Sequence, residues 1–335
     1  MGARIAALAE VLLVLALGNV IGAAIYPYVV SSAVLDGSAS DNSLAFASGL
    51  LIFLRLGSAA AIGLLLLYLR TGQTPRAAGL TRNGHSFSYL AKHGLVLGTI
   101  SSFLVGLLFF IHSIVPLGEG LAAWWTYDET PINSAFLISL LGTSILTPPL
   151  TEEILTRGYN RARLVESFGP MAGVVLTGLI FGLSHTRYLV ADGMMLLFMC
   201  EILLSSILWT YSAQKTGSII PALIAHSVSN GIASAILFNA WIPFFLLSIL
   251  LILIRKDVGE LLVNMKQDWQ IDGEKSNTWQ GMGIIFAVLA TALISLGQFG
   301  RLPTLIGLGV ACLAYCVGYA IYQKTMKSES QLRSS

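Results

Sequence analysis

The sequence predicts an all-α fold, a polytopic membrane bundle with about ten transmembrane helices. Of its 335 residues, 55% are hydrophobic and only 11% are charged, whereas soluble domains carry about 25% charged residues. Apolar stretches near the roughly 20 residues that a membrane crossing needs recur along the chain. The net charge is +2 and no run of like charge is long, which argues against a nucleic-acid-binding protein.

Ten apolar stretches are candidate crossings, and they divide the chain into three parts. Residues 1–132 hold N-terminal helices, 133–238 hold a core in which polar residues interrupt the apolar pattern, and 239–335 hold C-terminal helices with a polar loop or surface helix at 255–278. The first stretch is too long for a secretory signal and lacks a convincing cleavage site, so a retained helix is expected. The predicted crossings are 5–29, 44–69, 94–116, 133–150, 170–186, 193–213, 218–238, 241–254, 279–298 and 303–322.

The basic residues predict the orientation of the chain, because Lys and Arg concentrate in cytoplasmic loops. With Arg4 in the cytoplasm, 16 of the 19 basic residues fall on that side, and both termini are cytoplasmic. The opposite loops carry acidic residues instead. The 16 residues are Arg4, Arg70, Arg76, Arg82, Lys92, Arg157, Arg161, Arg163, Lys215, Arg255, Lys256, Lys266, Lys275, Lys324, Lys327 and Arg333.

One arginine and three cysteines lie inside apolar stretches. Arg55 sits within Ile52–Leu56, where a charge faces the bundle interior, and an internal ion pair with an acid such as Glu10 is expected. Cys200, Cys312 and Cys316 are expected to be buried spare thiols, with no disulfide framework or metal site.

Charged residues gather after a pair of prolines at 148–149. Glu153 and Arg157 are four residues apart, so on a helix they share a face and can form an ion pair. Glu152 is turned by about 100° from Glu153 and can face a different space. This arrangement anchors one carboxylate and leaves the other for proton transfer. The alternative is a simple helix start, with Thr151 as the N-cap and two acids favouring the helix dipole.

Two later segments add imidazoles and an amide to the apolar core. Phe181-Gly182-Leu183-Ser184-His185 ends one apolar stretch, and His226 and Asn230 share a face of another. Polar residues at such places often serve helix–helix hydrogen bonding. Ionisable groups within the membrane are nevertheless functional candidates by default, and three polar clusters within 79 residues favour a shared site.

The three clusters resemble the motifs of the CPBP family, the CAAX prenyl protease and bacteriocin-processing group of intramembrane proteases, similar to the Rce-type CAAX protease. The order and spacing of Glu152-Glu153-x-x-x-Arg157, Phe181-x-x-x-His185 and His226-x-x-x-Asn230 match, as does Gly158 after Arg157. The resemblance covers roughly 133–238. Thr156 stands where the family often has Phe. The resemblance implies an enzyme, a hydrolase of the bacterial cell membrane whose substrate is a membrane-associated peptide or protein, prenylated or of the leader type.

The expected chemistry is peptide-bond hydrolysis with water as the nucleophile, since the chain has no Gly-x-Ser-x-Gly and no His-Glu-x-x-His element. Glu152 is the expected general base. His185 would hold the water, His226 and Asn230 would stabilise the oxyanion, and Glu153 with Arg157 would orient Glu152. His185, His226 and Glu152 are also able to ligate zinc, so a metalloprotease and a metal-free glutamate protease remain open.

For these residues to meet, the chain must carry them to one depth in the membrane. We expect Pro148-Pro149 to break one crossing and the helix to resume at Thr151 inside the membrane. Glu152 is nine residues before Arg161, about 14 Å along a helix. The site would then lie in a central, water-filled cavity lined by broken backbone.

Two other functions fit a membrane bundle. A non-catalytic scaffold or bacteriocin-immunity protein on the same fold would be expected to lack one or more of the six residues, all of which are present. A transporter would show repeated halves, whereas here the intramembrane charges cluster in one third of the chain.

Overall fold

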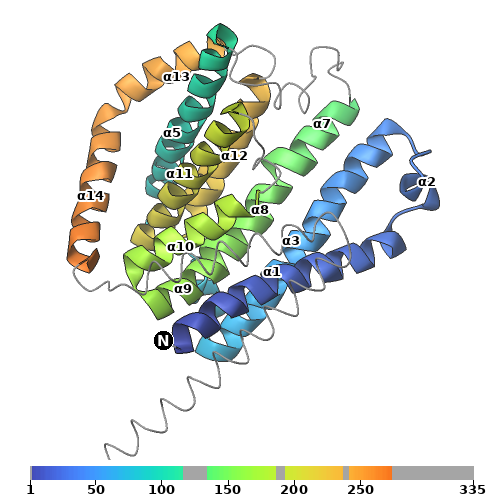
Figure 1. Ribbon diagram of the computed structural model, residues 1–335, viewed down its shortest axis with the longest axis horizontal. Coiled ribbons are helices and arrows are strands. Elements are labelled where there is room, and N and C mark those ends of the chain that lie inside the picture. The colour runs from blue at the N-terminus through green and yellow to red at the C-terminus, as the bar shows by residue number, and fades with distance from the viewer. Residues whose placement is uncertain (1, 116–133, 186–192, 237–240, 274–335) are drawn as a thin grey trace, which may run out of the picture.

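The computed structural model describes residues 2–115, 134–185, 193–236 and 241–273, and every regular element in these ranges is a helix. The all-α prediction is therefore confirmed for this part of the chain (Figure 1). The helices are α1 Gly2–Val29, α2 Ser32–Leu35, α3 Asp41–Thr71, α4 Thr74–Ala77, α5 Phe87–Ile114, α7 Ser134–Leu140, α8 Thr147–Glu153, α9 Arg161–Phe168, α10 Pro170–Leu183, α11 Gly193–Thr216, α12 Ile220–Ile236, α13 Trp241–Leu253 and α14 Arg255–Gly273, with two π-helical turns, η1 Leu141–Ile145 and η2 Ile154–Asn160.

The protein is a multi-pass membrane protein by the length and composition of its helices. Five helical stretches are long and apolar enough to cross a membrane: Gly2–Val29, Asp41–Thr71, Phe87–Ile114, Ser134–Phe168 and Gly193–Thr216. The apolar helices α10 and α13 are shorter. The crossings expected at 279–298 and 303–322, like Cys312 and Cys316, lie outside the described residues, so the count of ten stays a prediction. The polar segment 255–278 forms the surface helix α14 as far as Gly273.

Glycines four residues apart bring three pairs of helices into close contact. A Cβ on Gly18 or Gly22 of α1 would meet the backbone of α3 at Ala59 or Arg55. The same spacing recurs in two further helices. The glycines of α5 at 94 and 98 lie against α12, and those of α10 at 178 and 182 lie against α11. Small residues at this spacing let membrane helices approach closely, so the helices with the polar clusters are held to their neighbours by backbone contact.

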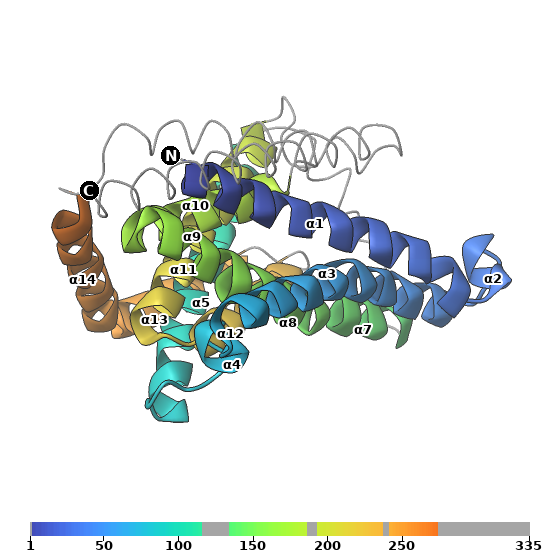
Figure 2. The same cartoon turned by 90° about the horizontal axis from the view of Figure 1, so that it is seen from below.

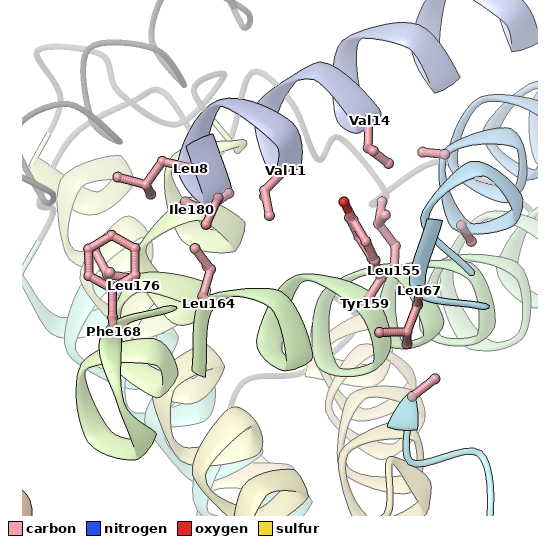
Figure 3. Packing of buried hydrophobic residues seen from close by; sticks show 14 residues of the cluster. Leu8, Val11, Val14, Leu67, Leu155, Tyr159, Leu164, Phe168, Leu176 and Ile180 are labelled. Carbon is pink, nitrogen blue, oxygen red and sulfur yellow. The ribbon is translucent and has the colours of Figure 1, made fainter. Parts of the chain in front are cut away.

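A buried carboxylate ties α1 to the core segment that contains the acidic pair. Glu10 of α1, only 3% exposed, accepts hydrogen bonds from Arg70 at 2.7 and 2.8 Å, from Arg163 at 3.0 Å and from the Tyr159 hydroxyl at 2.7 Å. Figure 3 shows Tyr159 and Leu155 extending toward α1, among the apolar side chains of this core. Three donors satisfy the charge, which is what allows a carboxylate to be buried here.

Several basic residues in the described part of the chain lie at one end of the bundle, unlike Arg55 and Arg157. Arg4 at the start of α1 donates to the Ser167 carbonyl at the end of α9, and Lys215 at the end of α11 pairs with Asp268 of α14 at 2.7 Å. Figure 2 shows α1 running beside α3, with α14 at one flank of the bundle. The position of these basic residues agrees with the charge bias of the sequence, while the side of the membrane that this end faces stays a prediction.

Two expectations from the apolar stretches are wrong. Arg55 does not pair with Glu10; its Nε donates to the Asn19 side chain at 2.8 Å. The antiparallel register of α1 and α3 puts Arg55 level with Gly22, twelve residues away from Glu10. Cys200 is exposed rather than buried, because its position on α11 faces away from the neighbouring helices.

Candidate active site

The helical rod from α7 to α9 carries the acidic pair, and it does not break at the prolines as expected. The segment Ser134–Phe168 continues as one helical stretch. Pro148 and Pro149 lie in the first turn of α8, after the π-helical turn η1, in which the Leu146 amide bonds back five residues to the Leu141 carbonyl. Proline is tolerated in a first turn because the amide it lacks has no partner there. The π-helical turn therefore accommodates two residues without amide hydrogens, and the helical rod continues past them.

The predicted ion pair of Glu153 and Arg157 is confirmed. The Arg157 Nη1 lies 2.8 Å from Glu153 Oε1, and both side chains are completely buried. The expected alternative, Thr151 as an N-cap, is wrong. The Thr151 hydroxyl donates to the Thr147 carbonyl at 2.7 Å, one turn back in the same helix.

Arg157 is enclosed by groups from two other helices. Its Nη2 donates to the Ser206 hydroxyl at 2.7 Å and to the Ser206 carbonyl at 3.2 Å. The guanidinium lies over the ring of Phe181 at 4.4 Å and over that of Trp209 at 5.4 Å. A guanidinium that is paired, hydrogen-bonded and stacked has a fixed position. Arg157 thus joins α10 and α11 to the acidic pair.

His226 of α12 lies between the two carboxylates. Its Nδ1 is 2.8 Å from Glu153 Oε1, and its Nε2 is 3.9 Å from Glu152 Oε2. The first distance is a hydrogen bond in which the ring nitrogen donates, since a carboxylate only accepts; the second is too long to be one. The imidazole is only 5% exposed and packs against Trp209 at 4.8 Å. The structure therefore brings together Glu152, Glu153, Arg157 and His226.

His185 lies beside this group, at the end of α10. Its ring is 4.9 Å from that of Phe181, and the Phe181 ring is 5.9 Å from that of His226. His185 Nδ1 lies 3.0 Å from the Phe181 carbonyl oxygen. A carbonyl oxygen only accepts, so this nitrogen carries a proton, and when the ring is neutral its Nε2 is an acceptor. Both imidazoles are therefore in contact distance of the same Phe181 ring.

Asn230, one turn beyond His226, is hydrogen-bonded to the helical rod from α7 to α9. Its Nδ2 donates to the Ser144 carbonyl at 2.8 Å. That carbonyl belongs to η1, and the residues four and five positions ahead of it are Pro148 and Pro149, neither of which has an amide hydrogen. Asn230 therefore satisfies a carbonyl that the two prolines leave without a backbone donor. An amide nitrogen carries two hydrogens, so one remains for another acceptor.

The described residues do not fit a metal ion. Within the described ranges no group of three or more His, Cys, Asp or Glu side chains is arranged to hold one. The candidate ligands His185, His226 and Glu152 do not form such a group, and we derive no step through a metal.

Sequence reasoning missed the residues that enclose Arg157. Ser206 and Trp209 of α11 lie in an apolar stretch whose pattern carries no polar motif. Phe181 lay within the noted Phe181-x-x-x-His185 segment, yet its stacking on Arg157 depends on how α10 packs on η2. The one available signal was the arginine itself, because a buried guanidinium needs acceptors and aromatic faces.

Comparison with known proteins bears on this same segment. Residues 133–232 match the family model described as Type II CAAX prenyl endopeptidase Rce1-like. The matched range contains all six residues of the candidate site. No curated protein and no solved structure matches the chain.

Proposed function

We propose that the chain is an intramembrane endopeptidase, because residues 133–232 match the family model described as Type II CAAX prenyl endopeptidase Rce1-like. It hydrolyses a peptide bond of a membrane-associated substrate, using a water activated by Glu152. Neither the scaffold nor the transporter alternative has an observation of its own in its favour.

The proposal rests on one observation, the convergence of Glu152, Glu153 and His226 from helices 73 residues apart in the chain. A membrane interior tolerates ionisable groups only where they are paired or functional. A structural role is met by the pair of Glu153 and Arg157 alone, in which each charge faces the other at 2.8 Å. It does not account for a second carboxylate directed at the far nitrogen of the same imidazole.

In the proposed reaction, Glu152 takes one proton from the water while the water oxygen attacks the scissile carbonyl carbon. The carbonyl electrons move to its oxygen, which His226 and the remaining Asn230 N–H stabilise. Glu152 then gives the proton to the amide nitrogen as the carbon–nitrogen bond breaks. The products are a carboxylic acid and an amine, so atoms and electrons balance.

The other residues position these groups. His185 accepts a hydrogen bond from the water through Nε2, because its Nδ1 proton is held by the Phe181 carbonyl. Glu153 orients His226 at 2.8 Å and is itself fixed by Arg157. Arg157 takes its place from Ser206 and from two aromatic rings. Glu153 and Arg157 are therefore positioning residues.

Replacing Glu152 tests the proposal. We expect Glu152→Gln to lower single-turnover cleavage by about 10²–10⁴-fold, because a positioned base contributes that much. The purified protein in detergent would be given prenylated and unprenylated peptides ending in a Cys-aliphatic-aliphatic-X sequence, with and without a chelator. Glu166→Gln is the matched control, since Glu166 lies on the surface of the same rod, beside Arg70 and Arg163.

Full cleavage by a folded Glu152→Gln variant would end the general-base proposal. Loss of wild-type activity on chelation, restored by zinc, would replace the metal-free step with a metal-dependent one. If no peptide is cleaved by the wild type in either prenylation state, the substrate class is wrong, and a library of membrane-protein leader peptides is the next probe.

A further inference from the structure

A shallow pocket lies at the basic end of the bundle, away from the candidate active site. It is formed by the connection between the membrane helices α3 and α5, has a volume of about 750 Å³, and is lined by Arg76 and residues 81–86. The proposed hydrolysis uses none of these residues. The pocket therefore has no role in that reaction.

The walls of the pocket are fixed to neighbouring helices. Asn83 donates from Nδ2 to the Thr216 carbonyl at the end of α11 at 3.1 Å, and the Gly79 carbonyl accepts from the Ile219 amide at 2.9 Å. Asn83 and Gly84 have φ angles of 47° and 82°. Two successive residues in this left-handed region make a sharp bend, and the two long-range hydrogen bonds hold it in place.

Within the described ranges, no carboxylate forms an ion pair with the two arginines of the pocket. Between Asp41 and Glu119 the sequence contains no acidic residue. Some basic groups of this end do have acidic partners; Lys92 pairs with Asp257 at 2.7 Å and Lys215 with Asp268 at 2.7 Å. In the described part of the chain, no ion pair reaches Arg76 or Arg82. The pocket thus concentrates positive charge that an external anion would neutralise.

The start of α5 adds to the positive potential. Ser86 caps the helix by accepting from the Tyr89 amide at 3.2 Å, and the first turn contains no acidic residue. Amide hydrogens in the first turn of a helix have no partner within the helix, and they carry the positive end of its dipole. The dipole therefore reinforces the two arginines.

We take as the rim of the pocket the exposed apolar and aromatic side chains next to its lining residues in the sequence. Leu80, Phe87 and Tyr89 are 37%, 58% and 42% exposed, and the loop joins two helices that are long enough to span a membrane. Aromatic side chains at this level sit among lipid head groups. An anion that fits both the charge and the rim has a phosphate head and an apolar tail.

We propose that this pocket binds the phosphate of an anionic phospholipid, with Arg76 and Arg82 as its ligands and the acyl chains lying over Leu80 and Phe87. Basic pockets between membrane helices on the cytoplasmic side suit such head groups. Each arginine near an anionic membrane surface contributes about five-fold in affinity, so removing both is expected to weaken binding by about 25-fold.

The test compares phosphatidylglycerol with phosphatidylcholine as probes, added to the full-length protein in a neutral detergent and counted as bound lipid by native mass spectrometry. The variant is Arg76→Gln/Arg82→Gln, and a third arm adds inorganic phosphate. The matched control is Arg255→Gln/Lys256→Gln, which removes the same charge from the start of α14, outside the pocket.

We expect the wild type to prefer phosphatidylglycerol, the pocket variant to lose that preference, and the α14 control to keep it. Equal loss in the control would show attraction to the whole basic end and overturn the site. Phosphatidylglycerol binding that is unchanged in the pocket variant would overturn it as well. Displacement of the lipid by millimolar inorganic phosphate would assign the site to free phosphate instead. If the double variant does not fold, Arg76→Lys/Arg82→Lys, which keeps the charge, should retain the preference, and its loss would count against the proposal.

Discussion

Replacing Asn230 tests whether its side chain supplies the hydrogen bond that the two prolines cannot supply. Asn230→Ala removes the hydrogen bond of 2.8 Å to the Ser144 carbonyl. No backbone amide can replace it, because positions 148 and 149 are both proline. A fully buried acceptor left without a partner costs about 1–3 kcal/mol, and this partly buried one should lie at the lower end of that range. We expect Asn230→Ala to lower the free energy of unfolding by that amount.

A second substitution should restore what the first removes. Pro148→Ala supplies an amide hydrogen four residues after Ser144, and the following turn already has this α-helical pattern, since the Leu150 amide bonds to the Leu146 carbonyl at 3.1 Å. In the double variant, the Ser144 carbonyl regains a donor from its own helix. The double-mutant cycle should therefore give a coupling energy of about 0.5–3 kcal/mol in favour of the pair.

Unfolding by denaturant in detergent, followed by tryptophan fluorescence, measures the four stabilities of the cycle. Cleavage assays on the same four proteins separate the two roles of Asn230. If the amide also stabilises the oxyanion, the double variant regains stability but still loses about 10²–10³ in turnover. Equal stability of Asn230→Ala and wild type would refute the carbonyl argument. Recovery of full turnover in the double variant would refute the oxyanion role.

Three further substitutions test the buried charges and the surface helix. Arg157→Ala should lower the free energy of unfolding by about 3–5 kcal/mol, because it leaves the Glu153 carboxylate buried without its cation. The double variant Glu153→Gln/Arg157→Met, which removes both charges, should lose less. Equal losses of the two variants in a denaturation series would contradict the ion pair. Glu201, buried at 8% exposure with Ser205 as its donor and no basic partner in the described ranges, should tolerate Glu201→Gln with a raised unfolding midpoint, and a lowered midpoint would show that the charge is needed. Hydrogen bonds from Lys215 and Tyr211 hold the pKa of Asp268 below its ordinary value of 3.8. The ionised carboxylate therefore stabilises the packing of α14, by less than about 1 kcal/mol. This stabilisation is complete well above pH 3.8 and is lost as the pH falls through the lower pKa of the folded state. Asp268→Asn should abolish that pH dependence of α14 amide exchange, and a variant that keeps it would contradict the assignment.

Local spacing made part of the site predictable. Glu153 and Arg157 are joined because four residues are about one helical turn, whatever surrounds the helix. The same reasoning placed His226 and Asn230 on one face. By contrast, the hydrogen bond from His226 to Glu153 links residues 73 positions apart. It depends on how α12 packs beside α8, and helical periodicity says nothing about that packing.

The wrong pairing of Arg55 has a physical reason that the sequence already contained. In an antiparallel hairpin, residues at equal distances from the turn lie at the same depth, and Gly18 opposite Ala59 and Gly22 opposite Arg55 obey this rule. Glu10, further from the turn, is level with the last turns of α3 and meets Arg70 instead. The predicted crossings at 5–29 and 44–69 were enough to exclude the pair of Arg55 and Glu10.

The proline pair shows how far such reasoning extends. Consecutive prolines inside a membrane crossing leave preceding carbonyls without backbone donors, and lipid offers none. The sequence therefore implies that some side chain must donate at Ser144, at the level of the candidate site. It does not identify Asn230 as that donor, because the choice is made by the packing of α12 on η1. The residue that the motif suggests for chemistry is thus also the one that the irregular backbone requires, and separating the two demands takes the cycle with Pro148.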